Sequence, residues 1–549
     1  MKSRVLQLDS RDNVLVALTD LKRGETIDWA GKEHVLKTDV PAKHKFATAD
    51  LAPGDRVVMY GVLVGQAVKP IAAGELLTVG NLRHEAAPFH EQSKGFEWPP
   101  PDVSRWRDAK FHGFHRPDSQ VGTRNYWLVV PLVFCENKNI QVLKQAFEEE
   151  LGFAAPQLYR RQVAELARQY REDRLAQPPG REMVQGQAST AHERLFPGVD
   201  GIRFLLHEGG CGGTHEDSEN LCGLIAGYIH HPNVAGATVL SLGCQHAQVD
   251  ILQTEIHKRN PRFDKPLFIF EQQKSGSESA MMTEAIRQTF LGLVEANKAQ
   301  RTLAPLSKLC VGLKCGGSDG FSGISANPAI GHTSDLLAGL GARTILSEFP
   351  ELCGVEQELI NRARSKDVGD RFIKIMSDYA ARAAAVRSTF EMNPSPGNMR
   401  DGLLTDAMKS AGAAKKGGKS TVTAVLDYPE YSTEPGLNLQ CTPGNDVECV
   451  TAQVGAGAGV VLFTTGLGTP TGNPITPVVK ISTNSALAQR MHDIIDVDTG
   501  AIISGTETIE HMGETILDLV VKVASGEVRT KAERKAQEDF IPWKRGVSL

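Results

Sequence analysis

The stretch LCVGLKCGGSDG at residues 309–320 decides the expected fold. Its apolar first half predicts a buried strand, and the glycines that follow predict a tight loop. A helical pattern covers residues 330–340, and apolar runs at 126–133, 204–206 and 237–242 likewise lead into loops. Repeated alternation of strand, loop and helix predicts a mainly parallel α/β sheet, in which sites form beyond the carboxyl ends of the strands.

The pattern divides the chain into four parts. Residues 1–85 carry short β-prone runs separated by turns, which predicts a small all-β domain. Residues 86–105 contain a run of three prolines and are expected to form an extended linker. Residues 106–390 hold the α/β pattern with cysteine- and glycine-containing loops. Residues 391–549 carry further apolar runs and are expected to form a C-terminal α/β domain.

Composition excludes several classes of protein. The 549 residues include 60 Lys and Arg against 65 Asp and Glu, a net charge of −5, so no basic excess favours nucleic-acid binding. No run approaches the roughly 18 apolar residues of a membrane span, and Met1–Asp9 lacks the apolar segment of a secretory signal. Nine cysteines, an odd number, argue against a disulfide framework. We expect a cytoplasmic protein that forms a homo-oligomer and binds a small molecule.

Four cysteines, Cys135, Cys211, Cys244 and Cys315, each follow an apolar strand, in or beside a loop that is in most cases rich in glycine. If the four strands are neighbours in one sheet, their loops converge and thiolates from distant parts of the chain can meet at one metal. Soft thiolates suit iron, zinc or an iron–sulfur cluster. The alternative is that these cysteines are small buried hydrophobic residues. Both interpretations remain open from the pattern alone.

Other segments offer weaker signals. The run Gly316–Asp319 ahead of a helix can present N–H groups to an anion, or can be an ordinary turn. His207 lies four residues before Cys211, and His44 lies in a basic loop of the β domain. Residues 413–420 resemble a P-loop but run from a helix into a strand, so we interpret them as a connection.

A set of longer motifs resembles a known family. They are VGTRNY at 121–126, the loop from His207 to Gly212, LGC at 242–244, CGGSDGFSG at 315–323, NPSPGN at 393–398, FTTGLGTP at 463–470 and KISTN at 480–484. Together with the small β domain, they resemble the altronate dehydratase/galactarate dehydratase family, whose N-terminal domain is of the SAF (β-clip) type. PGND at 443–446 is more similar to the altronate branch. Gly209, Gln245, Phe134 and Met399 depart from the family pattern, which leaves the sugar acid open.

The resemblance implies a lyase that removes water from a sugar acid, D-altronate as the best guess, to give a 2-keto-3-deoxy acid. A divalent metal, Fe²⁺ in the first place and Mn²⁺ as an alternative, is implied with it. Removing the proton α to a carboxylate creates a second negative charge, so the reaction needs a base and groups that stabilise an enediolate. The alternatives are a galactarate dehydratase, a related sulfo-lyase that expels sulfite, and a non-enzymatic sugar-acid binding protein.

Site residues follow from the same resemblance together with the chemistry. His207 is expected as base or ligand, and Lys480 and Arg124 as partners of the carboxylate or enolate. Two versions of the metal centre remain open. In one, Cys211, Cys244 and Cys315 hold iron or an iron–sulfur cluster; in the other, His44 and other imidazoles hold the ion and the cysteines only pack. The expected substrate-binding residues are Asn125, Gly316, Gly317, Ser318, Asp319, Thr464 and Thr465.

Overall fold

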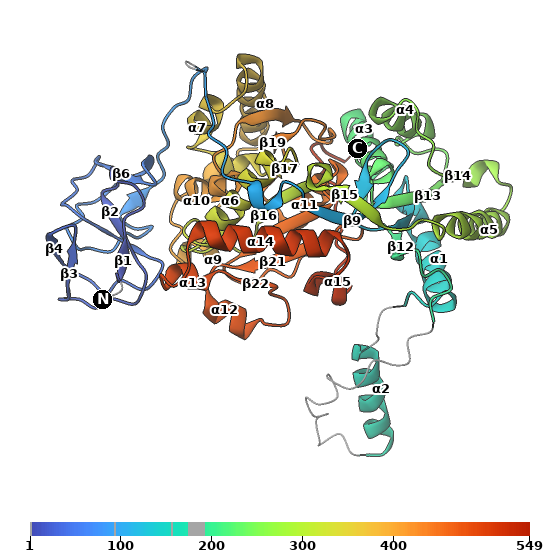
Figure 1. Ribbon diagram of the computed structural model, residues 1–549, viewed down its shortest axis with the longest axis horizontal. Helices are drawn as coiled ribbons and strands as arrows, with labels where there is room; N and C mark the ends of the chain where they lie inside the picture. Colours follow the sequence, from blue (N-terminus) through green and yellow to red (C-terminus); the bar gives the residue numbers. More distant parts are fainter. Residues whose placement is uncertain (1–2, 93–94, 155–157, 174–192, 549) are drawn as a thin grey trace.

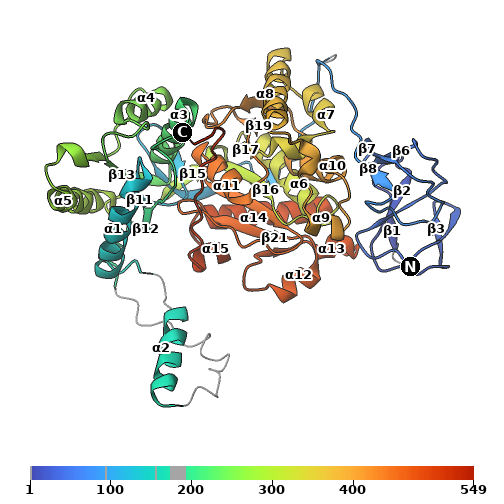
Figure 2. The ribbon, with the colours of Figure 1, turned by 180° about the vertical axis from the view of Figure 1, so that it is seen from behind.

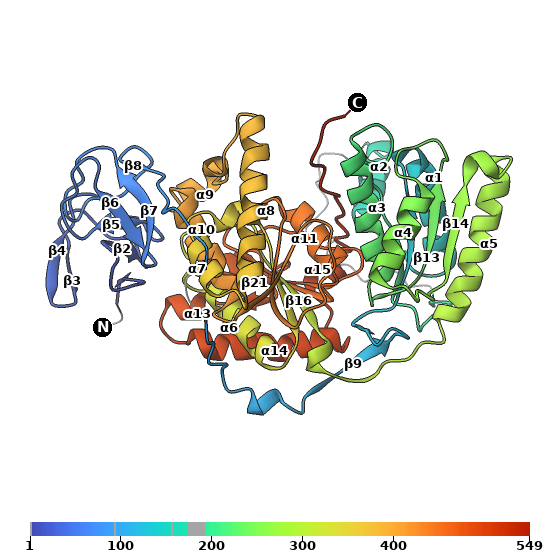
Figure 3. The same cartoon turned by 90° about the horizontal axis from the view of Figure 1, so that it is seen from above.

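The strands of the chain gather into an N-terminal antiparallel unit and two parallel sheets, which lie side by side along the long axis (Figures 1 and 3). The structure is a computed structural model, and it describes residues 3–92, 95–154, 158–173 and 193–548. A small β domain followed by mainly parallel α/β units confirms the expected fold class.

The N-terminal β domain is built from short hairpins. Its largest buried group includes Val57, Met59 and Val64, which pack against Phe321 and Met408 of the C-terminal part. The domain is therefore docked on the rest of the chain by apolar burial. Its strands are β1 (Val5–Leu6), β2 (Val14–Ala17), β3 (Thr26–Trp29), β4 (Lys32–Val35), β5 (Lys45–Ala47), β6 (Arg56–Met59), β7 (Val62–Ala67) and β8 (Leu82–Arg83).

The middle part is a four-stranded parallel sheet with the order β12-β11-β13-β14. Alternate residues of β11 face opposite sides: Leu128 packs in the core that contains α3 and α4, and Trp127 in the core that contains α1 and α5. Period-two alternation thus places helices on both faces. The elements are β11 (Tyr126–Pro131), α1 (Asn137–Glu150), α2 (Leu158–Arg171), β12 (Gly201–Phe204), α3 (His215–His230), β13 (Val234–Ser241), α4 (Val249–Arg259), β14 (Leu267–Glu271) and α5 (Glu278–Ala296).

The C-terminal part is a seven-stranded parallel sheet with the order β18-β19-β17-β16-β20-β21-β22, seen from behind in Figure 2. Its strands are β16 (Cys310–Cys315), β17 (Arg343–Leu346), β18 (Val422–Leu426), β19 (Gly436–Gln440), β20 (Val460–Thr465), β21 (Val478–Ser482) and β22 (Val497–Asp498). Its helices are α6 (Ala326–Gly339), α7 (Glu356–Asn361), α8 (Lys366–Ala385), α9 (Pro396–Arg400), α10 (Asp406–Ala414), α11 (Asp446–Gly455), α12 (Ser485–Arg490), α13 (Gly500–Ile503), α14 (Ile509–Ala524) and α15 (Lys531–Arg534).

The division of strands differs from a single α/β unit over residues 106–390. Strands β16 and β17 lie in that range, yet they pair with β20 and β19 of the C-terminal part. Strand partners are chosen by non-local burial, which a local pattern does not contain. The chain enters the middle part through β9 (Lys110–His115) and β10 (Val121–Gly122) and leaves it through β15 (Thr302–Pro305), and β9 pairs antiparallel with both of the others.

The last residues run between the two parallel-sheet units (Figure 3). The Trp543 ring packs on Tyr379 and Tyr428, and the backbone N–H groups of Arg545 and Gly546 donate to Asp217 of α3. This segment therefore joins the two units. Within the described ranges, none of the helices combines the length and the apolar character that crossing a membrane requires.

Candidate active site

A cavity of about 380 Å³ lies at the carboxyl edge of the seven-stranded sheet. Cys315–Ser318, at the end of β16, forms one wall, and Pro443–Asp446, ahead of α11, forms another. Residues of 393–398 complete the rim, together with the polar side chains of Glu351 and Lys409. Its position agrees with the general rule that sites in parallel sheets lie beyond the strand ends.

The loop after β16 needs its glycines. Gly317 has φ +59°, and a Cβ there would lie 2.8 Å from the Oγ1 atom of Thr469. A Cβ on Gly316 would collide with the carboxylate of Asp446 and with the Phe463 ring. Among the described residues, no acceptor is found for the N–H groups of Gly317 and Ser318. These two donors are available to an anion in the cavity.

The NPSPGN motif shapes the opposite rim. Ser395 caps α9 by accepting from the N–H of Asn398, while the Asn398 side chain accepts from the Ser395 N–H in return, and Pro396 occupies the first turn. The Asn398 Nδ2 atom also donates to the Ser318 carbonyl over 2.8 Å. The short helix α9 thereby fixes the backbone of the glycine loop.

Several charged side chains are buried beneath the cavity. Glu348 is fully buried and contacts two lysines: Lys314 on one carboxylate oxygen and Lys416, at 2.8 Å, on the other. Lys314 also lies 3.0 Å from Asp446. The Lys416 Nζ atom is 2.7 Å from the Sγ atom of Cys315. Because each of these buried charges contacts a charge of opposite sign, the side chains can remain ionised although they are buried.

A second ion pair reaches the cavity wall. Lys409 lies 2.7 Å from Glu351 and donates to Asn393 over 2.6 Å. Burial alone raises the pKa of Glu351, but the ammonium groups of Lys409, Lys314 and Lys416 outweigh it and lower that pKa to about 2. Glu351 is therefore a fixed carboxylate at neutral pH and a poor proton acceptor.

Cys315 and the two carboxylates form a possible cation site. The ligand atoms of Cys315, Glu348 and Glu351 lie within 4.8 Å of one another, and no other trio of His, Cys, Asp or Glu in the described residues does so. One thiol and two carboxylates suit a borderline divalent ion such as Fe²⁺ better than Mg²⁺. Burial raises the pKa of the Cys315 thiol to about 11, and an ion must compete with Lys416 and Lys409 for the same donors.

Lys480 is a buried lysine on β21, the strand next to β20. Lys314, Phe463 and Lys480 are register partners on β16, β20 and β21, and the Lys480 Nζ atom lies 3.5 Å from the centre of the Phe463 ring. Its side chain is 1% exposed, and in the described structure its Nζ has no hydrogen-bond partner. Burial lowers the pKa of Lys480 to about 7. A lysine in this state is half uncharged near neutral pH.

The N-terminal domain closes one side of this region. Lys43 lies 3.0 Å from Asp319 and 2.8 Å from Asp401. Lys45 is buried and donates to the Gly402 carbonyl, and burial lowers the pKa of Lys45 to about 7. His44, between them, is half-buried with its Nδ1 atom 3.2 Å from the carbonyl of Ala42. His44 thus lies at the domain interface, not among the Cys315 donors.

The remaining residues of the glycine loop and of β20 support the cavity from behind. Asp319 is fully buried and contacts Lys43, Ser322 and Thr483. Thr464 donates to Asn327 over 2.6 Å, and the Thr465 hydroxyl accepts the N–H groups of residues 468 and 469. Of the expected substrate contacts on these strands, Gly316, Gly317 and Ser318 line the cavity, while Asp319, Thr464 and Thr465 do not.

His207 lies in another part of the molecule. Its Nε2 atom is 2.7 Å from the carbonyl of Pro131, and its Nδ1 atom accepts the N–H of Gly209 over 3.1 Å. Burial lowers the pKa of His207 to about 4, so the ring is neutral with both nitrogens bonded to backbone. This arrangement leaves no free nitrogen for a base and indicates that His207 holds the loop after β12.

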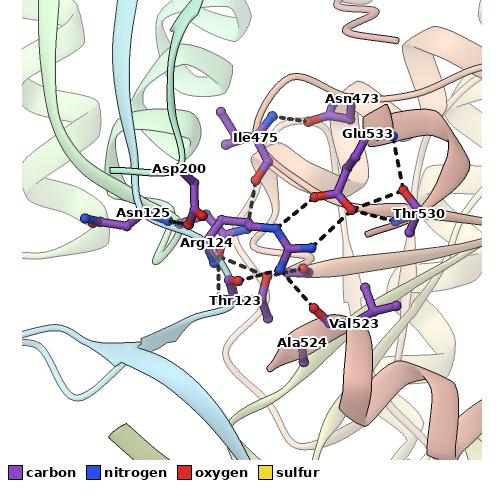
Figure 4. Close-up of polar contacts among 12 residues, drawn as sticks. Thr123, Arg124, Asn125, Asp200, Asn473, Ile475, Val523, Ala524, Thr530 and Glu533 are labelled. Atoms are coloured by element: carbon purple, nitrogen blue, oxygen red, sulfur yellow. Dashed lines mark hydrogen bonds and ion pairs between the residues drawn. The ribbon is translucent and has the colours of Figure 1, made fainter. Parts of the chain in front are cut away.

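Arg124 and Asn125 are also structural in this arrangement (Figure 4). The Arg124 guanidinium lies 2.8 Å from Glu533 and donates to the carbonyls of Thr123 and Val523. Asn125 donates to the carbonyls of residues 198 and 296. Because these groups precede β11, they lie at the amino end of that strand, and neither residue lines the Cys315 cavity.

The predicted thiol set is not assembled. Cys211 and Cys244 follow β12 and β13 of the four-stranded sheet, while Cys315 ends β16 of the other sheet. The cavity that Cys211 lines, about 980 Å³, shares no residue with the Cys315 cavity. The expectation required all strands in one sheet, and the sheet topology removes that premise.

Sequence reasoning missed the buried charges around Cys315. Glu348, Glu351, Lys409 and Lys416 were not among the expected site residues, although Lys416 lies in the segment interpreted as a connection. A usable signal existed: Lys409 lies within an Ala-rich helix that is buried along its length, and Lys416 lies two residues after that helix. Charged residues inside such a segment require partners.

Three models of one protein family match nearly the whole chain. Residues 3–85 match the altronate/galactarate dehydratase SAF domain, residues 113–297 the second domain of D-galactarate dehydratase/altronate hydrolase, and residues 306–548 the C-terminal domain of D-galactarate/altronate dehydratase. These three ranges coincide with the β domain and the two parallel-sheet units of the structure.

Curated relatives match over the same length. An altronate dehydratase of Bacillus subtilis (strain 168) is 31% identical over 553 residues, covering 100% of both chains. An altronate dehydratase of Escherichia coli (strain K12) is 32% identical, with 99% of each chain covered. A galactarate dehydratase (L-threo-forming) of the same organism is 30% identical, with 96% of this chain and 94% of the relative covered.

The fold is thus a SAF domain followed by two parallel-sheet units, with a polar cavity at the carboxyl edge of the larger sheet. The chain belongs to the altronate/galactarate dehydratase family. Its relatives' names support an enzyme of the hydro-lyase class.

Proposed function

We propose that this protein dehydrates a sugar acid, with D-altronate as the first candidate, in the cavity between Gly317 and Lys409. The observation that carries the proposal is the polar cavity itself, which is lined by Gly317 and Ser318, whose N–H groups have no acceptor among the described residues, and by the ammonium group of Lys409. The segment Pro443–Asp446, which is similar to the altronate branch, lines this cavity. Two relatives named altronate dehydratase match the chain from end to end.

Binding of the substrate carboxylate follows from the donors. The N–H groups of Gly317 and Ser318 point to an anion site of the kind that backbone amides form at tight glycine loops. Asn393 on the opposite rim offers its amide nitrogen to the hydroxyls of a polyol chain, whereas the Asn398 amide is bonded to Ser318 and Ser395. A ligand with one carboxylate and several hydroxyls matches this set, whereas an apolar ligand does not.

Lys480 is our candidate for the base. The reaction requires a group that is uncharged near neutral pH and that accepts the proton from C2. The pKa of Lys480, lowered to about 7 by burial, meets the first requirement, and its Nζ lacks a hydrogen-bond partner among the described residues. Lys480 does not line the cavity, but its Nζ contacts the Phe463 ring that a Cβ on Gly316 would also meet, which supports a position near the glycine loop.

The lysine cluster would stabilise the second negative charge. Lys409 lines the cavity with its pKa raised: burial opposes its charge, but Glu351 outweighs burial. Lys314 and Lys416 lie one layer deeper and also keep their protons. Such preorganised cations in a dry environment are worth more than the same charges in water. Cys315, Glu348 and Glu351 would hold a divalent metal, whose Lewis acidity polarises substrate oxygens.

A substrate panel tests the proposal. The purified protein is incubated anaerobically, with and without Fe²⁺, with D-altronate, with galactarate and with sulfolactate, and 2-keto-3-deoxy acid and sulfite are measured. We expect the highest rate of 2-keto-3-deoxy acid formation from D-altronate. Faster turnover of galactarate, or release of sulfite from sulfolactate, would mean that D-altronate is not the substrate, although the protein would still be a lyase. Binding of the acids without any product would favour the non-enzymatic alternative.

A further inference from the structure

Three cysteines follow neighbouring strands at the carboxyl edge of the four-stranded sheet, apart from the proposed catalytic cavity. Cys211, Cys135 and Cys244 follow β12, β11 and β13, and these strands are direct neighbours in the order β12-β11-β13. All three are free and exposed, unlike the buried cysteines of the seven-stranded sheet. The proposed dehydration uses none of them.

Backbone hydrogen bonds join the three loops beside these cysteines. The N–H of Phe134, the residue before Cys135, donates to the Gly209 carbonyl over 3.1 Å. The carbonyl of Gly210, the residue before Cys211, accepts the N–H of Ala247, three residues after Cys244, also over 3.1 Å. Gly210 has φ +98°, and a Cβ there would collide with the Leu132 carbonyl. The three loops therefore touch directly.

Side chains around the thiols have the chemistry of a metal site. Gln245 is 3% exposed, donates to Ser241 over 2.6 Å and accepts the Gly243 N–H over 2.7 Å, so it fixes the turn that presents Cys244. His215 and His246, on the same loops, have ring centroids 5.8 Å apart. Cys211 and the glycines at 209, 210, 212 and 213 line the cavity of about 980 Å³.

The spacing of the thiols selects between two kinds of centre. Sulfur atoms bound to a single zinc or iron ion at about 2.3 Å lie no more than about 4.6 Å apart. In the described residues, these three sulfurs are not all within 4.8 Å of one another. A cluster, in which each thiolate binds a different iron, tolerates a larger separation. The three sulfurs therefore do not form a preassembled mononuclear site, and a cluster is the centre that we consider.

We infer that Cys135, Cys211 and Cys244 hold an iron–sulfur cluster in the second domain. Each thiol releases its proton as its sulfur binds one iron, while the irons and the inorganic sulfides come from outside the protein. An iron that no cysteine reaches takes an imidazole of His215 or His246, or a small oxygen ligand. The tail residues Phe540–Trp543 line the same cavity as Cys211 and would border the cluster on that side.

Anaerobic reconstitution of the whole chain with Fe²⁺ and sulfide tests this inference. We expect iron and acid-labile sulfide in near-equal amounts per chain, with broad visible absorption from sulfur-to-iron charge transfer. Cys135→Ser, Cys211→Ser and Cys244→Ser should each lose at least half of the bound sulfide. Cys353→Ser, in the C-terminal unit after β17, is the control and should bind as much iron and sulfide as the wild type.

Two further measurements keep the inference independent of the proposed function. Cys315→Ser should keep the cluster absorption whatever it does to dehydration, because it lies in the other cavity. Circular dichroism verifies that each variant is folded. Iron bound without sulfide, or equal sulfide content in the triple cysteine variant and the wild type, would overturn the assignment.

Discussion

The Nζ atom of Lys416 lies 2.7 Å from the Sγ atom of Cys315, which lines the candidate active-site cavity. The same ammonium group is 2.8 Å from Glu348, so one lysine joins the possible metal ligands into a single buried network. Burial opposes the charge of Lys416, but Cys315 and Glu348 raise its pKa, so the proton stays on nitrogen. The network therefore contributes to stability as well as to the site.

Removing Lys416 should destabilise the fold. Lys416→Ala leaves a buried carboxylate with one cation fewer, and breaking such a pair costs about 3 kcal/mol of unfolding free energy. Urea unfolding followed by circular dichroism measures this loss. Lys419→Ala, an exposed lysine of the same loop, is the control and should change stability by no more than about 0.5 kcal/mol. Equal effects in the two variants would contradict a paired Lys416.

Removing the charge of Lys480 should stabilise the fold, in contrast to the removal of Lys416. The folded state lowers this pKa to about 7 from 10.5, so between these values the unfolded chain binds more protons and wild-type stability rises with pH. The wild type must bury a lysine that water would keep protonated, and Lys480→Met has no such free-energy cost. The variant should therefore be more stable than the wild type by about 1–4 kcal/mol near pH 6, and this difference should shrink toward pH 10. Thermal unfolding across this range measures it. A gain that does not depend on pH would show that Lys480 is not held uncharged.

The same pKa predicts the pH dependence of catalysis. If Lys480 accepts the C2 proton, only its uncharged form is active, so kcat should rise with pH and reach half of its plateau near pH 7. Lys480→Met should lose at least about a hundredfold in kcat while remaining folded. Initial rates at saturating substrate provide the profile. A flat profile from pH 6 to pH 9 argues against this assignment.

His207 should matter for stability and not for chemistry. Both of its ring nitrogens bond to backbone groups, so His207→Ala leaves the Pro131 carbonyl and the Gly209 N–H unpaired. We expect a loss of about 1–3 kcal/mol in unfolding free energy. The kcat of the folded fraction, determined by active-site titration, should stay within about tenfold of the wild type. Complete loss of turnover in a folded variant restores His207 as a catalytic residue.

Local elements were predictable, and their partners were not. The run ending at Pro131 and the run ending at Cys315 both form strands followed by loops, because apolar strands and glycine turns are encoded locally. Whether β16 joins β13 or β20 depends on packing between segments more than 100 residues apart. The cysteines were therefore predicted at the correct strand ends but grouped incorrectly: Cys315 belongs with Glu348 and Glu351.

The lining of the candidate site was predictable in part for the same reason. Gly316, Gly317 and Ser318 line the cavity, because glycines after a strand mark the loop that approaches a ligand. The lysines and glutamates around them come from α10, from the residues after α10 and from the loop after β17, and only the folded chain brings them together. Arg124 was expected at the site because it lies in a family motif, but its guanidinium forms an ion pair with Glu533 away from the cavity.

The most direct test of the account compares Lys409→Met with the wild type for 2-keto-3-deoxy acid formation from D-altronate in the presence of Fe²⁺. Lys409 is the ammonium group on the cavity wall, so its loss should lower kcat/KM by at least about a hundredfold. Lys419→Met serves as the control, and circular dichroism verifies folding. The account predicts product from the wild type and the control but almost none from Lys409→Met; equal rates in all three would contradict it.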